Sequence, residues 1–287
     1  MNLTSKTYLL TGASGGIGSA IASDLAKAGA SLILVGRSED KLQVLAKQLN
    51  GDNRQASFVL AADIASHDGL EVVRTALTAL NKPLDGVIHC AGINRFRFLA
   101  DTDPADIQAL IATNITAPIL LTRLVLPFLN RDNARIIFVG SSFGALGYPG
   151  FSVYSATKFA LRGFAQALRR ELADTAIQIA CLSPRATQTE LNSDAVCAMN
   201  RELGVTMDDP HIVAIEVKKM LLAKRMYDRN IGWPERFFIQ LNKLFPWLID
   251  KALRSQLPVV ARYAESSAHR GSPVHSLKHA PENIAKT

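Results

Sequence analysis

A regular alternation of short apolar runs with segments of helical periodicity constrains the fold of this chain more than any other feature. The runs are apolar at almost every position, as in TYLLT and SLILVG, which suits parallel strands covered by helices on both faces. We therefore predict an α/β fold, a Rossmann-type doubly wound parallel sheet in a three-layer α/β/α arrangement. Strands are expected within 6–12, 31–36, 56–63, 84–92, 134–142 and 177–184, and helices over about 17–28, 38–49, 66–80, 104–129 (interrupted near Pro118) and 151–173.

The pattern changes after Pro184. Residues 185–208 are mixed and polar, and they precede a helix expected over about 209–223 and a short strand near Ile231. Residues 235–254 carry apolar residues at helical spacing between basic ones, which predicts an amphipathic helix kinked at Pro246. We divide the chain into a main domain (1–232), an amphipathic helical extension (233–265) and a flexible tail (266–287) rich in Ser, His, Pro and Gly.

Composition excludes a disordered chain, because 48% of the residues are hydrophobic and 20% are charged. The net charge is +7; from residue 224 onward eleven Lys or Arg face five Asp or Glu, a balance of +6. These basic residues form no long run, so we expect a solvated basic surface and no nucleic-acid partner. Cys90, Cys181 and Cys197 lack metal-ligand spacing, so no metal site is expected; their odd number, without a secretory signal, fits reduced thiols in the cytoplasm. No uninterrupted apolar stretch reaches ~18 residues, which argues against a transmembrane helix.

A glycine-rich stretch, TGASGGIG, links the first expected strand to the first expected helix. It places glycines at Gly12, Gly16 and Gly18. Glycines let the backbone turn sharply and approach a pyrophosphate, and the helix N-terminus offers free amide donors. Tight turns alone also need glycine, but the position directly after a first strand favours a dinucleotide site. We assign Ser14 and Ile17 of the same loop to this site.

The residues after the second expected strand indicate which dinucleotide binds. NAD sites place a carboxylate there for the adenosine ribose, whereas this chain has Gly36, Arg37 and Ser38. A guanidinium would pair with the 2′-phosphate of NADP(H), so Arg37 and Ser38 predict that cofactor; the alternative is an exposed arginine at a strand end. Asp63, at the end of the third expected strand, can accept from the adenine amino group or cap the next turn.

The glycine loop is one of five motifs that occur together in one known family. The others are CAG (90–92), ATNITAP (112–118), VGSSFG (139–144) and YSATK (154–158). Through these motifs, in this order, residues 5 to about 190 resemble the short-chain dehydrogenase/reductase family. The C-terminal extension resembles that of carbonyl-reductase-like members.

The resemblance implies a catalytic set of Asn114, Ser141, Tyr154 and Lys158. Tyr154 would be the general acid and base for a carbonyl/alcohol pair, and Lys158, one helical turn away, would stabilise a phenolate and bind the nicotinamide ribose. Ser141 would hydrogen-bond the substrate oxygen; we choose it over Ser142 because it lies three residues before a glycine and thirteen before Tyr154. Asn114 would hold a water in a proton relay behind Lys158.

The same resemblance assigns further positions to the cofactor and marks departures from the family. The complete cofactor set is Gly12, Ser14, Gly16, Ile17, Gly18, Arg37, Ser38, Asp63, Ile64, Ala91, Gly92, Tyr154, Lys158, Pro184, Thr187 and Thr189. Arg185 stands where the family has Gly, and Cys90 where it has Asn. We expect Arg185 to face solvent rather than an anionic substrate group, and His89 to be a packed histidine.

These assignments predict an NADP(H)-dependent oxidoreductase that interconverts a ketone or aldehyde and an alcohol, acting on an apolar small molecule and forming a homo-oligomer. One alternative is a 3-oxoacyl thioester reductase with a basic mouth that includes Arg95 and Arg97. Another class is a non-catalytic NADP(H)-binding sensor or membrane-associated scaffold. The apolar face of the extension can cover the substrate mouth, pack in a dimer or rest on a membrane. The expected location is cytoplasmic, with peripheral membrane contact through the extension as an option.

Overall fold

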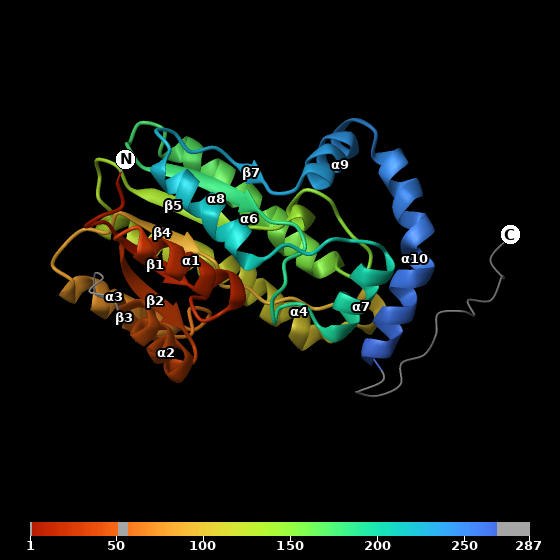
Figure 1. Cartoon of the computed structure of the whole chain (residues 1–287), viewed down its shortest axis with the longest axis horizontal. Coiled ribbons are helices and arrows are strands. Elements are labelled where there is room, and N and C mark those ends of the chain that lie inside the picture. The colour runs from red at the N-terminus through yellow and green to blue at the C-terminus, as the bar shows by residue number, and fades with distance from the viewer. Residues whose placement is uncertain (1, 51–56, 269–287) are drawn as a thin grey trace, which may run out of the picture.

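Seven parallel strands form one sheet in the order β3-β2-β1-β4-β5-β6-β7 (Figure 1). The structure is a computed structural model and describes residues 2–50 and 57–268. The strands are β1 Thr7–Thr11, β2 Ser31–Gly36, β3 Ser57–Ala61, β4 Gly86–His89, β5 Arg135–Val139, β6 Gln178–Ser183 and β7 Arg229–Asn230. The chain order reverses between β1 and β4, and the carboxyl ends of the strands open a crevice at such a switch point.

Helices cover both faces of this sheet (Figure 1). One core packs α1, α2 and α8 against the sheet through residues such as Leu25, Leu42 and Val217. The other packs α3, α5 and α6 through residues such as Val73 and Leu161. The bounds are α1 Gly16–Lys27, α2 Glu39–Asn50, α3 His67–Ala79, α4 Pro104–Ile111, α5 Ala117–Val125, α6 Ser152–Glu171 and α8 Pro210–Leu222. The predicted three-layer α/β/α fold is confirmed.

The helices begin where short polar side chains can satisfy their first amides. Ser66 accepts from the amide of Gly69 at the start of α3, and Asp209 accepts from that of His211 at the start of α8. Such caps explain why the expected helix starts lie within one or two residues of the observed ones.

A π-helical turn over Ala112–Thr116 joins α4 to α5 and carries the buried Asn114. Pro118 has no amide to donate to the carbonyl one turn earlier, which accounts for the wider turn at this point. The predicted interruption near Pro118 is therefore confirmed, a few residues before the proline.

Within the described residues, the stretch Pro104–Phe128 is the one helical segment long and apolar enough to cross a membrane, with a mean hydropathy of 1.7. Its side chains Leu121, Leu124 and Val125 belong to the core under α5. The segment therefore has the place of a core helix in this fold.

The C-terminal third contains helices that the sequence prediction did not separate. α7, Asp194–Glu202, lies within the segment described as mixed and polar. The extension is two helices, α9 Trp233–Leu244 and α10 Pro246–Ala268, rather than one kinked helix. Pro246 disfavours helical backbone at Phe245, whose φ and ψ of −137° and 62° end α9. α10 continues three residues past the boundary expected at 265, and the rest of the predicted tail lies outside the described residues.

Candidate active site

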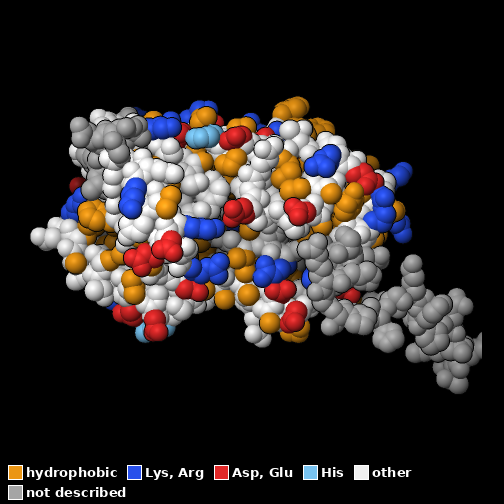
Figure 2. Space-filling model, turned by 60° about the horizontal axis from the view of Figure 1, so that its bottom comes forward, with side chains coloured by type: hydrophobic (Ala, Val, Ile, Leu, Met, Phe, Trp, Pro, Cys, Tyr) orange, Lys and Arg blue, Asp and Glu red, His pale blue; other side chains and the backbone are white. Residues whose placement is uncertain are grey.

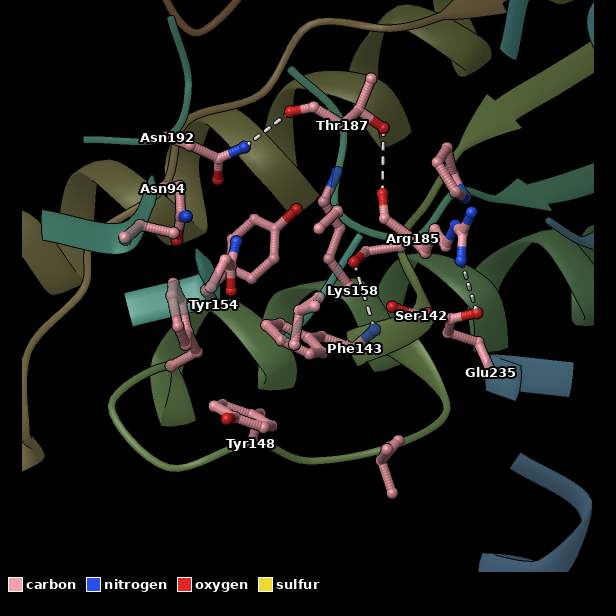
Figure 3. Close-up of a pocket in the computed structure, with 18 of the residues that line it drawn as sticks. Asn94, Ser142, Phe143, Tyr148, Tyr154, Lys158, Arg185, Thr187, Asn192 and Glu235 are labelled. Atoms are coloured by element: carbon pink, nitrogen blue, oxygen red, sulfur yellow. Dashed lines mark hydrogen bonds and ion pairs between the residues drawn. The ribbon is translucent and has the colours of Figure 1, made fainter. Parts of the chain in front are cut away.

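A cavity of about 450 Å³ lies at the carboxyl ends of the central strands, a size typical of small-molecule sites (Figure 3). Residues at the ends of β5 and β6 line one side of the cavity, and residues of α9 and α10 line the opposite side. Most of the lining is apolar, including Phe143, Leu146, Tyr148, Phe151, Val196, Met199, Phe238, Ile239, Ile249 and Leu253. The extension therefore lines this cavity, and its role as a cover for a substrate stays a prediction.

Tyr154 and Lys158 lie next to each other on the wall of this cavity (Figure 3). Both are in the first turns of α6 and nearly buried, with 7% and 5% exposed. The Lys158 Nζ atom is 5.6 Å from the centroid of the Tyr154 ring and donates to the carbonyl of Val139 at 3.3 Å. Further along α6, Leu161 and Ala165 are buried in the core and fix the helix on the sheet. The pair is thus held rigidly at the cavity.

Two adjacent serines also line the cavity directly after β5. The Ser141 Oγ atom accepts from the amide of Phe143 at 3.1 Å, which leaves its hydroxyl proton free to donate. Ser142 is buried, and its amide donates to the carbonyl of Pro184. The free proton of Ser141 is what stabilising a substrate oxygen requires.

Asn114 is buried near Lys158 rather than on the cavity wall. Its amide clamps the backbone of Ile93, accepting from the nitrogen and donating to the oxygen, each at 2.9 Å. It also donates to the hydroxyl of Thr157 at 3.1 Å. A Cβ on Gly92 would lie 3.3 Å from Asn114 Oδ1 and 3.5 Å from Lys158 Nζ, so both side chains border that glycine. The side chain thus anchors the loop after β4, and the expected water-holding role stays a prediction.

The glycine loop leaves the backbone at the start of α1 free of side chains at Gly16 and Gly18. Gly12 has a φ of +64°, and a Cβ on Gly18 would lie 2.0 Å from the carbonyl oxygen of Gly12. α1 has no side-chain cap and no acidic residue in its first turn, so its first amides are free to bind phosphate. A Cβ on Gly16 would lie 2.8 Å from the methyl group of Thr189, so that residue stands beside the same loop. These residues fit a dinucleotide.

Arg37 and Ser38 follow β2 and are exposed. Arg37 forms no ion pair with any residue in 2–50 or 57–268, so its guanidinium is available for an anion. Lys41, in the first turn of α2, is a second exposed cation in this segment, which the sequence analysis did not assign to the site. It lies 3.7 Å from the exposed Glu190. Asp63 caps the next turn by accepting from the amide of Ala65, one of its two expected roles.

The structure divides the expected site residues into two groups. Those on the cavity wall are Ile17, Gly92, Ser141, Tyr154, Lys158, Pro184, Thr187 and Thr189. The others are Gly12, Ser14, Gly16, Gly18, Arg37, Ser38, Asp63, Ile64, Ala91 and Asn114, none of which lines the cavity. Thr11 was missed: its Oγ1 accepts from the amides of Cys90 and Ala91 and joins β1 to the loop after β4. Within the described residues, no His, Cys, Asp and Glu side chains gather to hold a metal.

Arg185 does not face solvent, and that expectation is wrong. Its guanidinium binds both carboxylate oxygens of Asp208, at 2.9 and 2.6 Å. It also lies 3.7 Å from Glu235 Oε2, as Figure 3 shows. Hydrogen bonding to Asp208 raises the pKa of Arg185 above its usual value. With two carboxylates beside it, Arg185 is neutralised and is not free to bind an anionic substrate group.

His89 is the last residue of β4, and Cys90 follows it. The His89 ring is buried and stacks on Phe138 at 4.7 Å, and burial lowers its pKa to about 3. The expectation of a packed histidine is confirmed. Burial raises the pKa of the Cys90 thiol to about 12, although the nearby Lys158 ammonium opposes the shift. This thiol is therefore a poor nucleophile at neutral pH.

A doubly wound sheet with a bare glycine loop at its switch point defines a dinucleotide-binding protein. The family model described as short chain dehydrogenase matches residues 6–199. The chain belongs to the short-chain dehydrogenase family, which consists of oxidoreductases that bind a nicotinamide cofactor.

Similar proteins agree with this family. Ketoacyl reductase HetN of Nostoc sp. (strain PCC 7120) is 33% identical over 224 residues, covering 77% of this chain and 77% of that protein. An NADP-dependent 3-hydroxy acid dehydrogenase of Schizosaccharomyces pombe is 35% identical over 193 residues, covering 66% and 74%. A crystal structure of a short chain dehydrogenase from Burkholderia cenocepacia J2315 in complex with NADP has a TM-score of 0.72 at 27% identity, covering 81% of this chain and 98% of that one.

Proposed function

We propose that the protein is an NADP(H)-dependent oxidoreductase that interconverts an apolar ketone or aldehyde and its alcohol. The observation that carries the proposal is the buried Tyr154–Lys158 pair, which lines the same apolar cavity as Ser141. This cavity adjoins the loop whose glycines and free helix amides suit a dinucleotide. A phenol, an ammonium and a hydroxyl at one point serve a reaction in which an oxygen gains or loses a proton.

The chain's own residues have distinct tasks in this reaction. The bound nicotinamide would supply or accept the hydride. Tyr154 would give its hydroxyl proton to the carbonyl oxygen during reduction and take it back during oxidation. The Lys158 ammonium would stabilise the phenolate that results, and the Ser141 hydroxyl would hold the substrate oxygen. The apolar lining would exclude water, which strengthens each of these interactions.

The preference for NADP(H) over NAD(H) is part of the proposal. Arg37 directly after β2 and Lys41 in the first turn of α2 provide two cations in the segment where a carboxylate would repel a phosphate. The Schizosaccharomyces pombe relative is named as NADP-dependent, and the Burkholderia cenocepacia structure contains NADP. Both observations support the same cofactor.

A second candidate is a 3-oxoacyl thioester reductase, because one relative is named a ketoacyl reductase. The expected basic mouth gives it little support. Arg95 is held by Asp106 at 2.7 Å, and neither Arg95 nor Arg97 lines the cavity. An apolar ketone therefore fits the described residues better than an acidic carrier.

We also propose a homo-oligomer located in the cytoplasm. Ile111, Leu120 and Phe159 are exposed apolar side chains on α4, α5 and α6, and a second copy would cover such residues. The three cysteines are free, as expected for a reducing compartment. Sedimentation at several protein concentrations would measure the assembly.

A substrate screen tests the proposed reaction. The protein would be incubated with NADPH and a panel of ketones, aldehydes and 3-oxoacyl thioesters while NADPH oxidation is followed, with NADH in a parallel series. We expect turnover of apolar carbonyls that Tyr154→Phe abolishes, while NADPH binding by titration persists. Tight NADPH binding without turnover of any panel member would instead indicate a non-catalytic sensor or scaffold.

A further inference from the structure

The two C-terminal helices carry an unusual share of the exposed apolar surface. We call residues 233–257 the C-terminal hairpin. Of the nineteen large hydrophobic side chains exposed in the described part of the chain, eight lie in it: Trp233, Phe237, Phe238, Leu244, Phe245, Trp247, Leu248 and Leu257. Scattered exposed hydrophobic residues are normal, but such a concentration in twenty-five residues indicates an interaction surface.

The exposed residues follow a geometric pattern. Trp233, Phe237 and Leu244 share one face of α9, because positions i, i+4 and i+11 fall within about 40° of each other around a helix. Phe245, between α9 and α10, and Trp247, in the first turn of α10, add two more exposed aromatic side chains. Leu244 and Trp247 are 69% and 61% exposed. The tip of the hairpin is thus an apolar projection.

Basic side chains accompany this apolar surface. Arg236, Lys243, Lys251 and Arg254 are all exposed, whereas the exposed acidic residue of the hairpin is Asp250. The other carboxylate, Glu235, is turned inward beside Arg185. Basic and apolar side chains lie side by side at the end of the molecule that carries α10 (Figure 2). The hairpin therefore combines exposed tryptophans with a net positive charge.

The inner side of the same hairpin lines the cavity. Ile239 and Ile249 are buried there, and Leu253 lines the wall beside them. The hairpin therefore has an apolar cavity on one side and an apolar outer surface on the other.

We propose that the C-terminal hairpin binds the surface of an anionic lipid membrane and that the enzyme takes its apolar carbonyl substrate from that membrane. Tryptophans with adjacent lysines and arginines suit the boundary between headgroups and acyl chains. A second copy fits less well, because a two-fold contact centred on the hairpin would bring its net positive charge against the same charge of the other copy. The uptake of substrate from the membrane rests on the proposed function, whereas the membrane contact does not.

Vesicle flotation of the full chain tests the contact. Vesicles of phosphatidylcholine alone would be compared with vesicles that also contain phosphatidylglycerol. We expect binding to the anionic vesicles and at least about a tenfold weaker partition for Leu244→Ser/Trp247→Ser, since two large apolar side chains no longer enter the lipid. Arg236→Glu/Lys243→Glu should also weaken binding, and salt should weaken it further.

Matched variants keep the result interpretable. Leu99 and Tyr227 are as exposed as the hairpin residues but lie outside the hairpin, so Leu99→Ser/Tyr227→Ser should bind like the unchanged protein. Circular dichroism would confirm that each variant is folded. Absence of binding to anionic vesicles would overturn the proposal. Binding unaffected by the hairpin variants would overturn it as well, and so would dimerisation through the hairpin without lipid binding.

Uptake of the substrate from the membrane is tested by a separate measurement. A long-chain ketone embedded in anionic vesicles should be reduced several-fold more slowly by Leu244→Ser/Trp247→Ser than by the unchanged protein, while a short water-soluble ketone should be reduced equally by both. Equal rates on the embedded ketone would contradict delivery from the membrane. Flotation is measured without substrate, so its outcome is independent of whether the enzyme reduces any ketone.

Discussion

At the residue scale, Arg37 is the side chain that would distinguish the two nicotinamide cofactors. It is exposed at the end of β2 and pairs with no acidic residue in the described part of the chain. Arg37→Asp should raise the KM for NADPH at least about tenfold, because a charge-assisted contact of 1.5–3 kcal/mol is replaced by repulsion. The KM for NADH should change much less. Initial rates with both cofactors would measure the two values.

A second exposed arginine provides the control for Arg37. Arg131 precedes β5 and so lies at the opposite edge of the sheet from the carboxyl ends. Arg131→Asp changes the net charge equally and should leave both KM values unaltered. If Arg37→Asp did the same, the phosphate assignment would be wrong.

The buried His89 should make the free energy of unfolding of the protein depend on pH. Its pKa is about 3 when folded and near 6.5 when unfolded, so between these values the unfolded chain binds a proton that the folded chain does not. The stabilisation from the neutral ring is therefore complete above about pH 6.5 and is lost as the pH falls, by up to about 1.4 kcal/mol per pH unit. The Thr122 hydroxyl donates to Pro118 at 2.6 Å and so can accept from His89 Nε2 at 3.0 Å, while Nδ1 has no partner for an added proton.

Unfolding by urea at several pH values, with His89→Met beside the unchanged protein, would measure this effect. The variant has no titrating ring, so the difference in unfolding free energy should shrink from about pH 6.5 to pH 4.5 and stay constant from pH 7 to 8. If the curves of unfolding free energy against pH were parallel for the two proteins, the His89 ring would titrate alike in the folded and the unfolded chain.

At the scale of elements, the strands and helices up to Pro184 could be read from the sequence because buried parallel strands and amphipathic helices have clear periodicities. α7 could not, since its buried residues Val196 and Met199 lie among polar ones and pack mainly on aromatic residues distant in sequence. The partners of Arg185 could not be predicted from the sequence either. Asp208 and Glu235 are 23 and 50 positions away, and no local pattern reports such contacts.

Arg185 links three elements, and its loss should be costly. It connects the end of β6 to Asp208 and to the first turn of α9, and the Asp208 side chain is only 6% exposed. Arg185→Gly, which restores the residue usual in the family, should lower the unfolding free energy by about 3–5 kcal/mol because a buried carboxylate loses its partner. Urea unfolding would measure the loss. Adding Asp208→Asn should recover part of it, and equal stability of the single and double variants would count against this explanation.

At the scale of the whole molecule, the extension and the main domain share one core. Val260 and Ala264 of α10 pack with Phe96 and Phe151 of the main domain and with Met199 of α7. The boundary expected at residue 232 therefore separates two sequence patterns rather than two independent cores. Because this shared core adjoins the cavity, the extension should influence catalysis through the shape of the substrate space.

Two leucines one turn apart on α10 test this influence. Leu253 lines the cavity, whereas Leu257 is exposed and does not. Leu253→Asn should lower kcat/KM for an apolar ketone about tenfold or more, since an apolar contact is lost and an amide is left without a partner. NADPH affinity should be unchanged, because the glycine loop and Arg37 lie outside the contacts of α10. Leu257→Asn should leave kcat/KM for a water-soluble ketone intact. Equal effects of the two substitutions would mean that α10 acts on the site through stability alone, and that the cavity wall it provides has no part in recognising the substrate.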